Sequence, residues 1–303
     1  MLVIVAPGQG AQTPGFLSPW LELPGFRDRL SAWSEIAKLD LVAYGTTAEA
    51  EEIRDTAVAQ PLLVAAALAA FEELGVAPDL VAGHSVGEFA AAALAGVITA
   101  DQAVSLVAER GRAMAEAAAV TATGMTAILG GVDVLDALAK LGLTPANNNG
   151  AGQIVAGGTL EQLEALQADP PQRARLRALA VAGAFHTHHM APAVERLRAA
   201  AAGVTPADPA IRLLSNADGA IVMSGRDALD RMVDQVSNPV RWDLCMETMA
   251  EETGETPVTM IELLPGGTLT GLAKRGLPGS VTVALKTPAD LTTALDAAKE
   301  AIK

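Results

Sequence analysis

The sequence predicts an α/β protein in which a large domain built on a parallel sheet is interrupted by a smaller domain. The 303 residues exceed the roughly 150 that are typical of one domain. Half of the residues are hydrophobic, which is enough for a large core and excludes a chain that is disordered throughout. Short apolar runs are followed by tight turns and Ala-rich helical segments, a pattern typical of parallel α/β sheets.

The N-terminal third contains two strand–turn–helix units. Leu2–Ala6 is an apolar, β-branched run that ends at Pro-Gly and predicts a buried strand. Pro61–Leu74 predicts a helix with Pro61 in its first turn. Leu80–Ala82 predicts the second strand, which leads into a glycine turn and an Ala-rich helix. Asp101–Ala119 continues as helix, with an acidic residue at its N-terminus.

The middle of the chain has a different pattern, β-α-β-β-α-β, which is typical of a ferredoxin-like domain. The expected strands are residues 125–129, 145–149, 153–156 and 174–181, and the expected helices are residues 132–141 and 160–166. We therefore predict a ferredoxin-like small domain at residues 124–189, inserted into a large catalytic domain formed by residues 1–123 and 190–303.

The α/β pattern resumes after the insertion. Helices are expected at residues 191–202 and near Leu229 and Trp242, and strands at residues 211–214, 258–263 and 281–285. The sequence shows neither an internal repeat nor a low-complexity linker.

Charge and composition exclude several classes of function. With 21 basic and 35 acidic residues the net charge is −14, and only 3% of residues are aromatic. A nucleic-acid partner needs a basic footprint or stacking aromatics, so none is expected.

The single cysteine, Cys245, allows no intramolecular disulfide and fits a reducing cytoplasm. The N-terminus lacks the features of a signal peptide, and the apolar run 57–71 is interrupted by Gln60 and Pro61, so no membrane span is expected.

The segment Gly83-His84-Ser85-Val86-Gly87 matches G-x-S-x-G between a strand and a helix. Two glycines allow a sharp turn that exposes the Ser85 hydroxyl at a helix N-terminus, as in α/β-hydrolases. We therefore expect an α/β-hydrolase-like large domain with Ser85 as its nucleophile. The alternative is an ordinary strand-to-helix turn.

A serine hydroxyl needs a base, and the chain has only four histidines. His84 adjoins Ser85 in a tight turn, where neighbouring side chains point apart, so it is expected to be structural. His186, His188 and His189 lie where the chain leaves the inserted domain, a natural place for a cleft. A metal site there is disfavoured, because no cysteine is near and no H-E-x-x-H spacing occurs. No acidic residue is singled out for a triad, which favours a Ser-His dyad.

The first strand runs into Pro7-Gly8-Gln9-Gly10-Ala11-Gln12, but Thr13 occupies the position at which a dinucleotide fingerprint needs its third glycine. The loop can instead supply a backbone donor beside the serine turn. The N–H groups of Gln9 and Val86 would then form an oxyanion hole. The alternative is a turn whose glycines serve only conformation.

Several motifs occur in one order along the chain: Gly8-Gln9-Gly10-Ala11-Gln12, Gly83-His84-Ser85-Val86-Gly87-Glu88, Arg110-Gly111, Phe185-His186, Asn238-Pro239-Val240 and Pro265-Gly266-Gly267-Thr268-Leu269. Together they resemble the malonyl-CoA:acyl carrier protein transacylases, the acyltransferases of fatty-acid and polyketide synthesis. The resemblance covers essentially the whole chain.

The resemblance implies the catalytic roles. Ser85 would take the malonyl group from coenzyme A, and His186 would be its general base. The imidazole would be held by the backbone carbonyl of Gln235, with Asn238 supporting the site. The amides proposed above would form the oxyanion hole. The reaction would be a double displacement with ping-pong kinetics.

The resemblance also implies how the substrate is recognised. Arg110 would hold the malonyl carboxylate in a bidentate pair. Met114, one helical turn further on, would line the same pocket. Phe185, directly before the histidine, accompanies malonyl selectivity in related acyltransferases, because its ring occupies the space of an α-methyl group. From the sequence alone, Arg110 is no better a choice than Arg112.

The implied partners are malonyl-CoA as substrate and an acyl carrier protein that brings its own phosphopantetheine. No cofactor and no metal are expected, and a monomer suffices. Local basic positions could dock an acidic carrier; the candidates are Arg173, Arg175, Arg177, Lys274 and Arg275. For each of them the alternative is an ordinary solvated charge.

Two other functions share parts of this pattern. A serine hydrolase or thioesterase would have the same turn and base but would release a free acid. A non-catalytic protein that binds carriers is disfavoured, because both Ser85 and His186 are present.

Overall fold

The computed structural model describes residues 1–254 and 256–301. Its larger sheet has the strand order β11-β10-β1-β2-β7-β8, and all neighbours are parallel except the antiparallel pair β7–β8. The strands are β1 (Leu2–Ala6), β2 (Leu80–Gly83), β7 (Arg212–Leu214), β8 (Ile221–Val222), β10 (Thr259–Glu262) and β11 (Val281–Ala284). The α/β class predicted from the sequence is confirmed.

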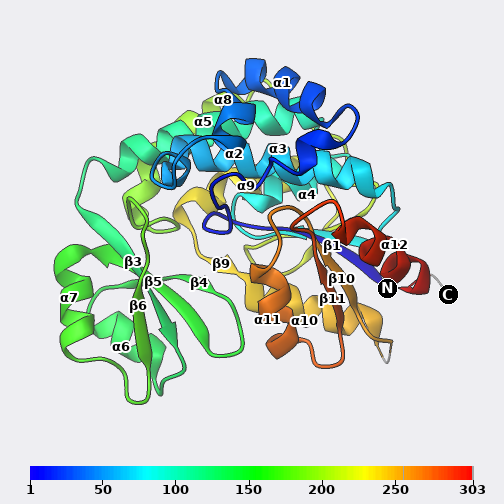
Figure 1. Ribbon diagram of the computed structural model, residues 1–303. Helices are drawn as coiled ribbons and strands as arrows, with labels where there is room; N and C mark the ends of the chain where they lie inside the picture. Colours follow the sequence, from blue (N-terminus) through cyan, green and yellow to red (C-terminus); the bar gives the residue numbers. More distant parts are fainter. Residues whose placement is uncertain (255, 302–303) are drawn as a thin grey trace.

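Strand β1 lies inside this sheet and is buried on both faces, as its uninterrupted apolar sequence predicts. Leu2, Ile4 and Ala6 face one core, and Val3 and Val5 face the other. Residues of helices α1, α2, α3, α4, α5, α8, α9 and α12 belong to the first core, and those of α10 and α11 to the second (Figure 1). These helices are α1 (Phe26–Ala37), α2 (Leu41–Thr46), α3 (Thr56–Leu74), α4 (Gly87–Leu94), α5 (Ala100–Ala118), α8 (Ala191–Ala201), α9 (Gly225–Asp234), α10 (Trp242–Thr253), α11 (Thr268–Gly276) and α12 (Asp290–Ala301).

The second sheet has the order β6-β3-β5-β4-β9 and lies beside the large one, drawn mostly in green in Figure 1. Its elements are β3 (Thr123–Leu129), α6 (Val134–Lys140), β4 (Thr144–Asn148), β5 (Gln153–Thr159), α7 (Leu160–Ala168), β6 (Arg175–Ala178) and β9 (Val240–Arg241). Strands β6, β3, β5 and β4 pair antiparallel. Together with α6 and α7 they form a small separate core that includes Ile128, Leu138 and Leu166. Strand β9 comes from far along the chain and pairs parallel with β4, so a later segment completes this sheet.

Helix α3 begins five residues before the predicted start. The Asp55 carboxylate accepts a hydrogen bond from the Ala57 N–H, which caps the helix at Thr56. Pro61 therefore lies inside the helix, where it removes one backbone hydrogen bond, rather than in the first turn. The prediction was wrong because an interior proline was taken for a helix start.

One helix among the described residues is long and apolar enough, by length and composition, to cross a membrane. It is α3, which has 19 residues. The expectation that Gln60 and Pro61 interrupt this apolar run is therefore wrong, since both residues lie within the continuous helix. However, 78% of the apolar window is buried within the protein, as in the core helix of a globular domain.

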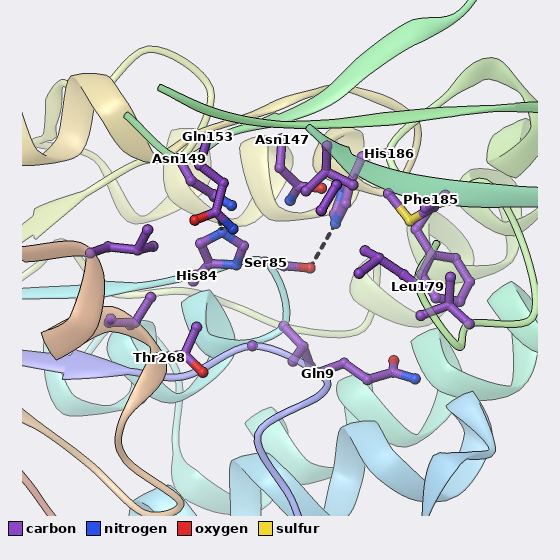
Figure 2. Close-up of a pocket in the computed structure, with 18 of the residues that line it drawn as sticks. Gln9, His84, Ser85, Asn147, Asn149, Gln153, Leu179, Phe185, His186 and Thr268 are labelled. Carbon is purple, nitrogen blue, oxygen red and sulfur yellow. Dashed lines mark hydrogen bonds between the residues drawn. The ribbon is translucent and has the colours of Figure 1, made fainter. Parts of the chain in front are cut away.

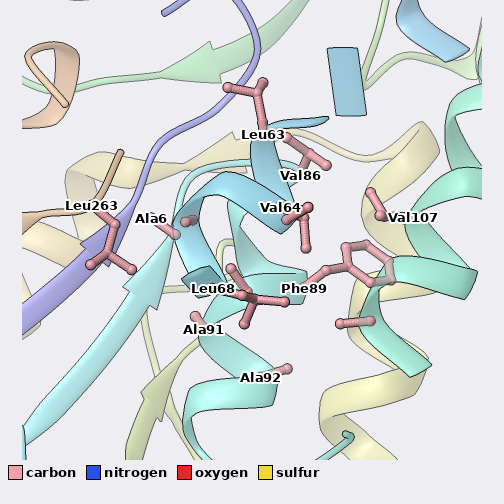
Figure 3. Packing of buried hydrophobic residues seen from close by; sticks show 14 of the residues in the cluster. Ala6, Leu63, Val64, Leu68, Val86, Phe89, Ala91, Ala92, Val107 and Leu263 are labelled. Atoms are coloured by element: carbon pink, nitrogen blue, oxygen red, sulfur yellow. The ribbon is translucent and has the colours of Figure 1, made fainter. Parts of the chain in front are cut away.

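Helices α3, α4 and α5 pack closely around the side chains of Leu68 and Phe89 (Figure 3). Helix α4 is rich in alanine, which lets its backbone approach its neighbours. Leu68 is 4% exposed, and Val64 and Val107 belong to the same core.

We expect Leu68→Ala to lower the free energy of unfolding by about 2–5 kcal/mol, because it removes buried contacts and leaves a cavity. Val120 is 76% exposed, so Val120→Ala is the matched control and should change stability by less than about 0.5 kcal/mol. Urea unfolding measures both. Equal losses in the two variants would contradict this packing.

Candidate active site

The site lies where the parallel strands of the large sheet end. Ala6 pairs with Gly83 in the register of β1 and β2, so the loop after β1 runs beside the turn after β2. The first loop carries Gln9 and the second Ser85. Both residues line a pocket of about 200 Å³, with Thr268 from the start of α11 on the same pocket (Figure 2). This edge is the usual ligand position in open α/β sheets.

Ser85 sits on a strained turn. Its φ of 53° is in the left-handed region, which costs a non-glycine residue about 1–2 kcal/mol. The side chain of Asn216, which follows β7, hydrogen-bonds to the backbone on both sides of the turn. Its Oδ1 accepts a hydrogen bond from the Ser85 N–H at 2.8 Å, and its Nδ2 donates to the Gly83 carbonyl at 2.7 Å. The strain is therefore sustained by a buried amide from a distant segment.

Ser85 and His186 are in hydrogen-bonding contact. The Ser85 Oγ lies 2.7 Å from the His186 Nε2 (Figure 2). The other ring nitrogen, Nδ1, lies 2.8 Å from the backbone carbonyl of Gln235, which can only accept a hydrogen bond. Nδ1 therefore carries the proton, and Nε2 is free to accept one from the serine. A backbone carbonyl, rather than a carboxylate, orients the ring.

The environment keeps His186 neutral. Its side chain is buried, and burial together with the nearby positive charge of Arg110 lowers its pKa to about 3. The hydrogen bond to the Gln235 carbonyl opposes this shift but does not cancel it. At neutral pH the imidazole is unprotonated, as a general base must be.

Arg110 lies beside the serine and is 1% exposed. Its Nη1 donates to the Gln60 Oε1 at 2.7 Å and its Nη2 to the Gln235 Oε1 at 2.9 Å, while Nη2 is also 3.4 Å from the Ser85 Oγ. Its Nε has no hydrogen-bond partner among the described residues. Burial lowers the arginine pKa to about 10, which Glu88 opposes, so the group stays cationic at neutral pH.

Arg112 has a different environment from Arg110. Its side chain is 38% exposed, and it donates to Glu109 and to the Ala37 carbonyl, away from Ser85. Met114 and Phe185 both line the pocket and are almost fully buried.

The two amides predicted to face an oxyanion belong to residues that line this pocket. Neither the Gln9 N–H nor the Val86 N–H has a hydrogen-bond partner within the part of the chain that the structure describes. Asn238 lies near His186, where the resemblance implies that it supports the site. Its side chain is exposed and donates to the Asp234 carbonyl, whereas its backbone N–H shares the Gln235 carbonyl with His186.

Within the described residues, the other three histidines make no hydrogen bond to the Ser85 hydroxyl. The His84 Nε2 is 2.8 Å from the Asn149 Oδ1, and burial lowers the His84 pKa. His188 and His189 stack on each other in a 3-10 helix with ring centroids 4.1 Å apart. Within residues 1–254 and 256–301, no group of three or more His, Cys, Asp or Glu side chains is placed to hold a metal ion.

Three polar residues of the site were missed in the sequence. Gln60 contacts Arg110, and Asn216 holds the serine turn. Glu88 is 4% exposed, accepts a hydrogen bond from the Asn216 N–H and contacts the Gln235 side chain. Burial raises the pKa of Glu88 to about 8, against the opposing effects of the Asn216 hydrogen bond and the Arg110 charge. Only Glu88 had a signal, an acidic residue directly after the G-x-S-x-G turn.

The glycines of the turn generate a prediction. A Cβ at Gly87 would lie 2.3 Å from the Ala6 carbonyl oxygen, so Gly87→Ala must displace the turn. We expect labelling of Ser85 by a serine-directed fluorophosphonate to slow by at least about tenfold. Gly203, whose Cβ would meet no atom closer than 3.9 Å, provides the control Gly203→Ala. Unchanged labelling of the Gly87 variant would contradict the geometry.

The lowered pKa of His186 generates a second prediction. A base that titrates near pH 3 stays neutral through the mildly acidic range, so the fluorophosphonate labelling rate should vary by less than about threefold between about pH 5 and pH 8. The labelling rate at each pH is measured by quenching the reaction at timed intervals and recording the intact mass. Loss of half the rate near pH 6.5, the ordinary histidine pKa, would refute the assignment.

Comparison with known proteins shows which family this chain belongs to. Residues 3–290 match the acyl transferase domain family. The malonyl CoA-acyl carrier protein transacylase of Mycobacterium tuberculosis is 56% identical over 299 residues, which cover 96% of this chain and 98% of that protein. The crystal structure of MCAT from Mycobacterium tuberculosis has a TM-score of 0.93 and 55% identity, and it covers 97% of this chain and 99% of that one.

A malonyl-transacylase solved in complex with its type II PKS acyl-carrier protein is also similar, with a TM-score of 0.89 and 33% identity. The match covers 97% of this chain and 99% of that chain. Both the sequence matches and the structural matches thus extend over almost the full length. This chain belongs to the acyl transferase domain family.

Proposed function

We propose that this protein transfers a malonyl group from malonyl-CoA to the phosphopantetheine thiol of an acyl carrier protein, for fatty-acid or type II polyketide synthesis. The observation that carries the proposal is the buried Arg110 guanidinium, 3.4 Å from the Ser85 Oγ. A carboxylate at the far end of an acyl group bound to Ser85 would meet this cation. The names of its relatives favour the same substrates.

The proposed reaction has two displacements. His186 Nε2 takes the Ser85 proton while Oγ attacks the thioester carbon, and the coenzyme A thiolate leaves and recovers that proton. The carrier thiol then gives its proton to His186 and attacks the malonyl ester, and the Ser85 Oγ leaves and is reprotonated. The amides of Gln9 and Val86 would stabilise the oxyanion in both steps. Every transferred proton passes through this Ser-His dyad.

Specificity would come from the walls of the acyl pocket. Arg110 would bind the free carboxylate, and Met114 and Phe185 would limit the space beside the α-carbon. Excluding a single methyl group is worth only about 1–3 kcal/mol, so some methylmalonyl transfer is expected. The Gln235 carbonyl would orient the His186 ring by accepting its Nδ1–H. Asn238 would support this carbonyl by donating its backbone N–H to it.

We propose the same domain types for this chain as the sequence predicts. The β-α-β-β-α-β order and the strand order β6-β3-β5-β4 support a ferredoxin-like small domain, and the serine turn supports an α/β-hydrolase-like large domain. We keep residues 124–189 as the small domain and residues 1–123 and 190–303 as the catalytic domain. Strand β9, from the second part of the catalytic domain, would tie the two together.

The proposed chemistry needs no cofactor, because the serine, the histidine and the two thiols account for each bond that changes. All the groups named come from one chain, which is consistent with a monomer. A cytoplasmic location is proposed on the single cysteine, which allows no intramolecular disulfide. Exposed basic side chains support carrier docking at five positions, Arg173, Arg175, Arg177, Lys274 and Arg275.

The proposal predicts a covalent intermediate. Brief mixing with malonyl-CoA should add one malonyl group to the protein, and Ser85→Ala should abolish this adduct. Arg110→Ala should slow malonylation by at least about tenfold more than acetylation from acetyl-CoA, because only malonate has the carboxylate. Intact mass measures both reactions.

The outcomes separate the competing functions. Release of free malonate with no adduct and no transfer to a carrier would make the protein a hydrolase. Equal losses of malonyl and acetyl transfer in Arg110→Ala would remove Arg110 from carboxylate recognition.

A further inference from the structure

The side chain of Gln235 touches parts of the site that its carbonyl does not. Gln235 is 4% exposed and begins the short 3-10 helix Gln235–Ser237 after α9. Its carbonyl accepts the hydrogen bond from His186, while its side-chain Oε1 accepts one from Arg110 Nη2 at 2.9 Å. One residue therefore contacts both the base and the cation, through different atoms.

The direction of the Gln235 amide is fixed by what surrounds it. Its Nε2 faces acceptors only: the Glu88 carboxylate, the Asn216 Oδ1 at 3.2 Å and the Ser85 carbonyl at 3.3 Å. Reversing the amide would set its oxygen against these acceptors and its N–H groups against the Arg110 N–H groups. Such a reversal would leave buried donors and acceptors unpaired, which is strongly unfavourable.

Glu88 supplies the carboxyl group of this set. One carboxylate oxygen accepts from the Asn216 N–H and the other from the Gln235 side chain, so both oxygens face donors. It sits on the first turn of α4, three residues after the nucleophile. The carboxyl oxygen next to Gln235 accepts a hydrogen bond from the N–H side of the amide, which favours the observed direction of the amide.

We propose that Glu88 and the Gln235 side chain together determine selectivity for carboxylate-bearing donors, Glu88 by orienting the amide and Gln235 by holding the Arg110 guanidinium toward the acyl group. Gln60, on α3, accepts a hydrogen bond from Nη1, so the two glutamines bind the guanidinium from different helices. The Nε of Arg110 has no hydrogen-bond partner among the described residues. Glu88 and Gln235 are positioning residues, since they act on the substrate through Arg110. The inference rests on the proposed malonyl transfer.

Gln235→Met tests this because it deletes the amide and keeps the backbone carbonyl that orients His186. The readouts are kcat/KM for malonyl-CoA and the rate of fluorophosphonate labelling, which needs the Ser85–His186 pair but no carboxylate contact. We expect the malonyl value to fall about 10- to 100-fold, mainly through KM, with labelling within about threefold of the wild-type rate. Equal losses in both would mean that the side chain only supports the fold.

Glu88→Gln and the double variant test the link between the two residues. Glu88→Gln should lower the ratio of kcat/KM for malonyl-CoA to the rate of fluorophosphonate labelling. Adding it to Gln235→Met should lower that ratio no further, because the amide through which it acts is gone. Glu109→Gln is the matched control, since Glu109 adjoins Arg110 in sequence but pairs with Arg112 and Arg196 on the outer side of α5.

Additive effects of Glu88→Gln and Gln235→Met on the ratio would overturn the link between them. An unchanged ratio in Gln235→Met would overturn the role of the amide and leave Gln60 as the residue that holds Arg110. The proposed function fails in a different way, because the unsubstituted protein would then form no malonyl adduct at all.

Discussion

The structure depends on the close approach of α4 to β1 and β2, which leaves no space for side chains at two positions. A Cβ on Gly83 would lie 1.9 Å from the Gly87 carbonyl carbon, and one on Gly87 would lie 2.3 Å from the Ala6 oxygen. The chain must therefore turn sharply between strand and helix, and Ser85 takes a left-handed conformation at the tip. Asn216 hydrogen-bonds to both Gly83 and Ser85, so Ser85 is held in this conformation by packing and by buried hydrogen bonds rather than by its own backbone preference.

A second constraint follows from placing charges beside that turn. Arg110 and Glu88 are both buried, and burial alone opposes the charged form of each. The amide of Gln235 lies between them, accepting from the arginine and donating to the carboxylate. The positive charge of Arg110 in turn helps to keep His186 neutral. The arginine proposed to bind the carboxylate and the histidine proposed as the base thus belong to one polar cluster at the end of the sheet.

The sequence predicted the parts of this arrangement that are local. The strand, glycine turn and helix around Ser85 lie in one short segment, and the base was narrowed to three histidines in another. The contacts that complete the cluster join residues far apart: Asn216 lies 131 positions from Ser85, and Gln235 lies 125 from Arg110. No local pattern encodes such pairs. Helix α3 was misjudged because Pro61 resembles a start signal, and the two-residue strand β9 is too short to have a period.

The central claim is that one polar cluster both activates Ser85 and receives the carboxylate of the acyl group. The most direct test is a crystal structure of the protein after reaction with malonyl-CoA. The account predicts an ester on the Ser85 Oγ, its carbonyl oxygen toward the amides of Gln9 and Val86, and its carboxylate on the Arg110 guanidinium. An acyl group on another residue, or a carboxylate directed away from Arg110, would contradict it.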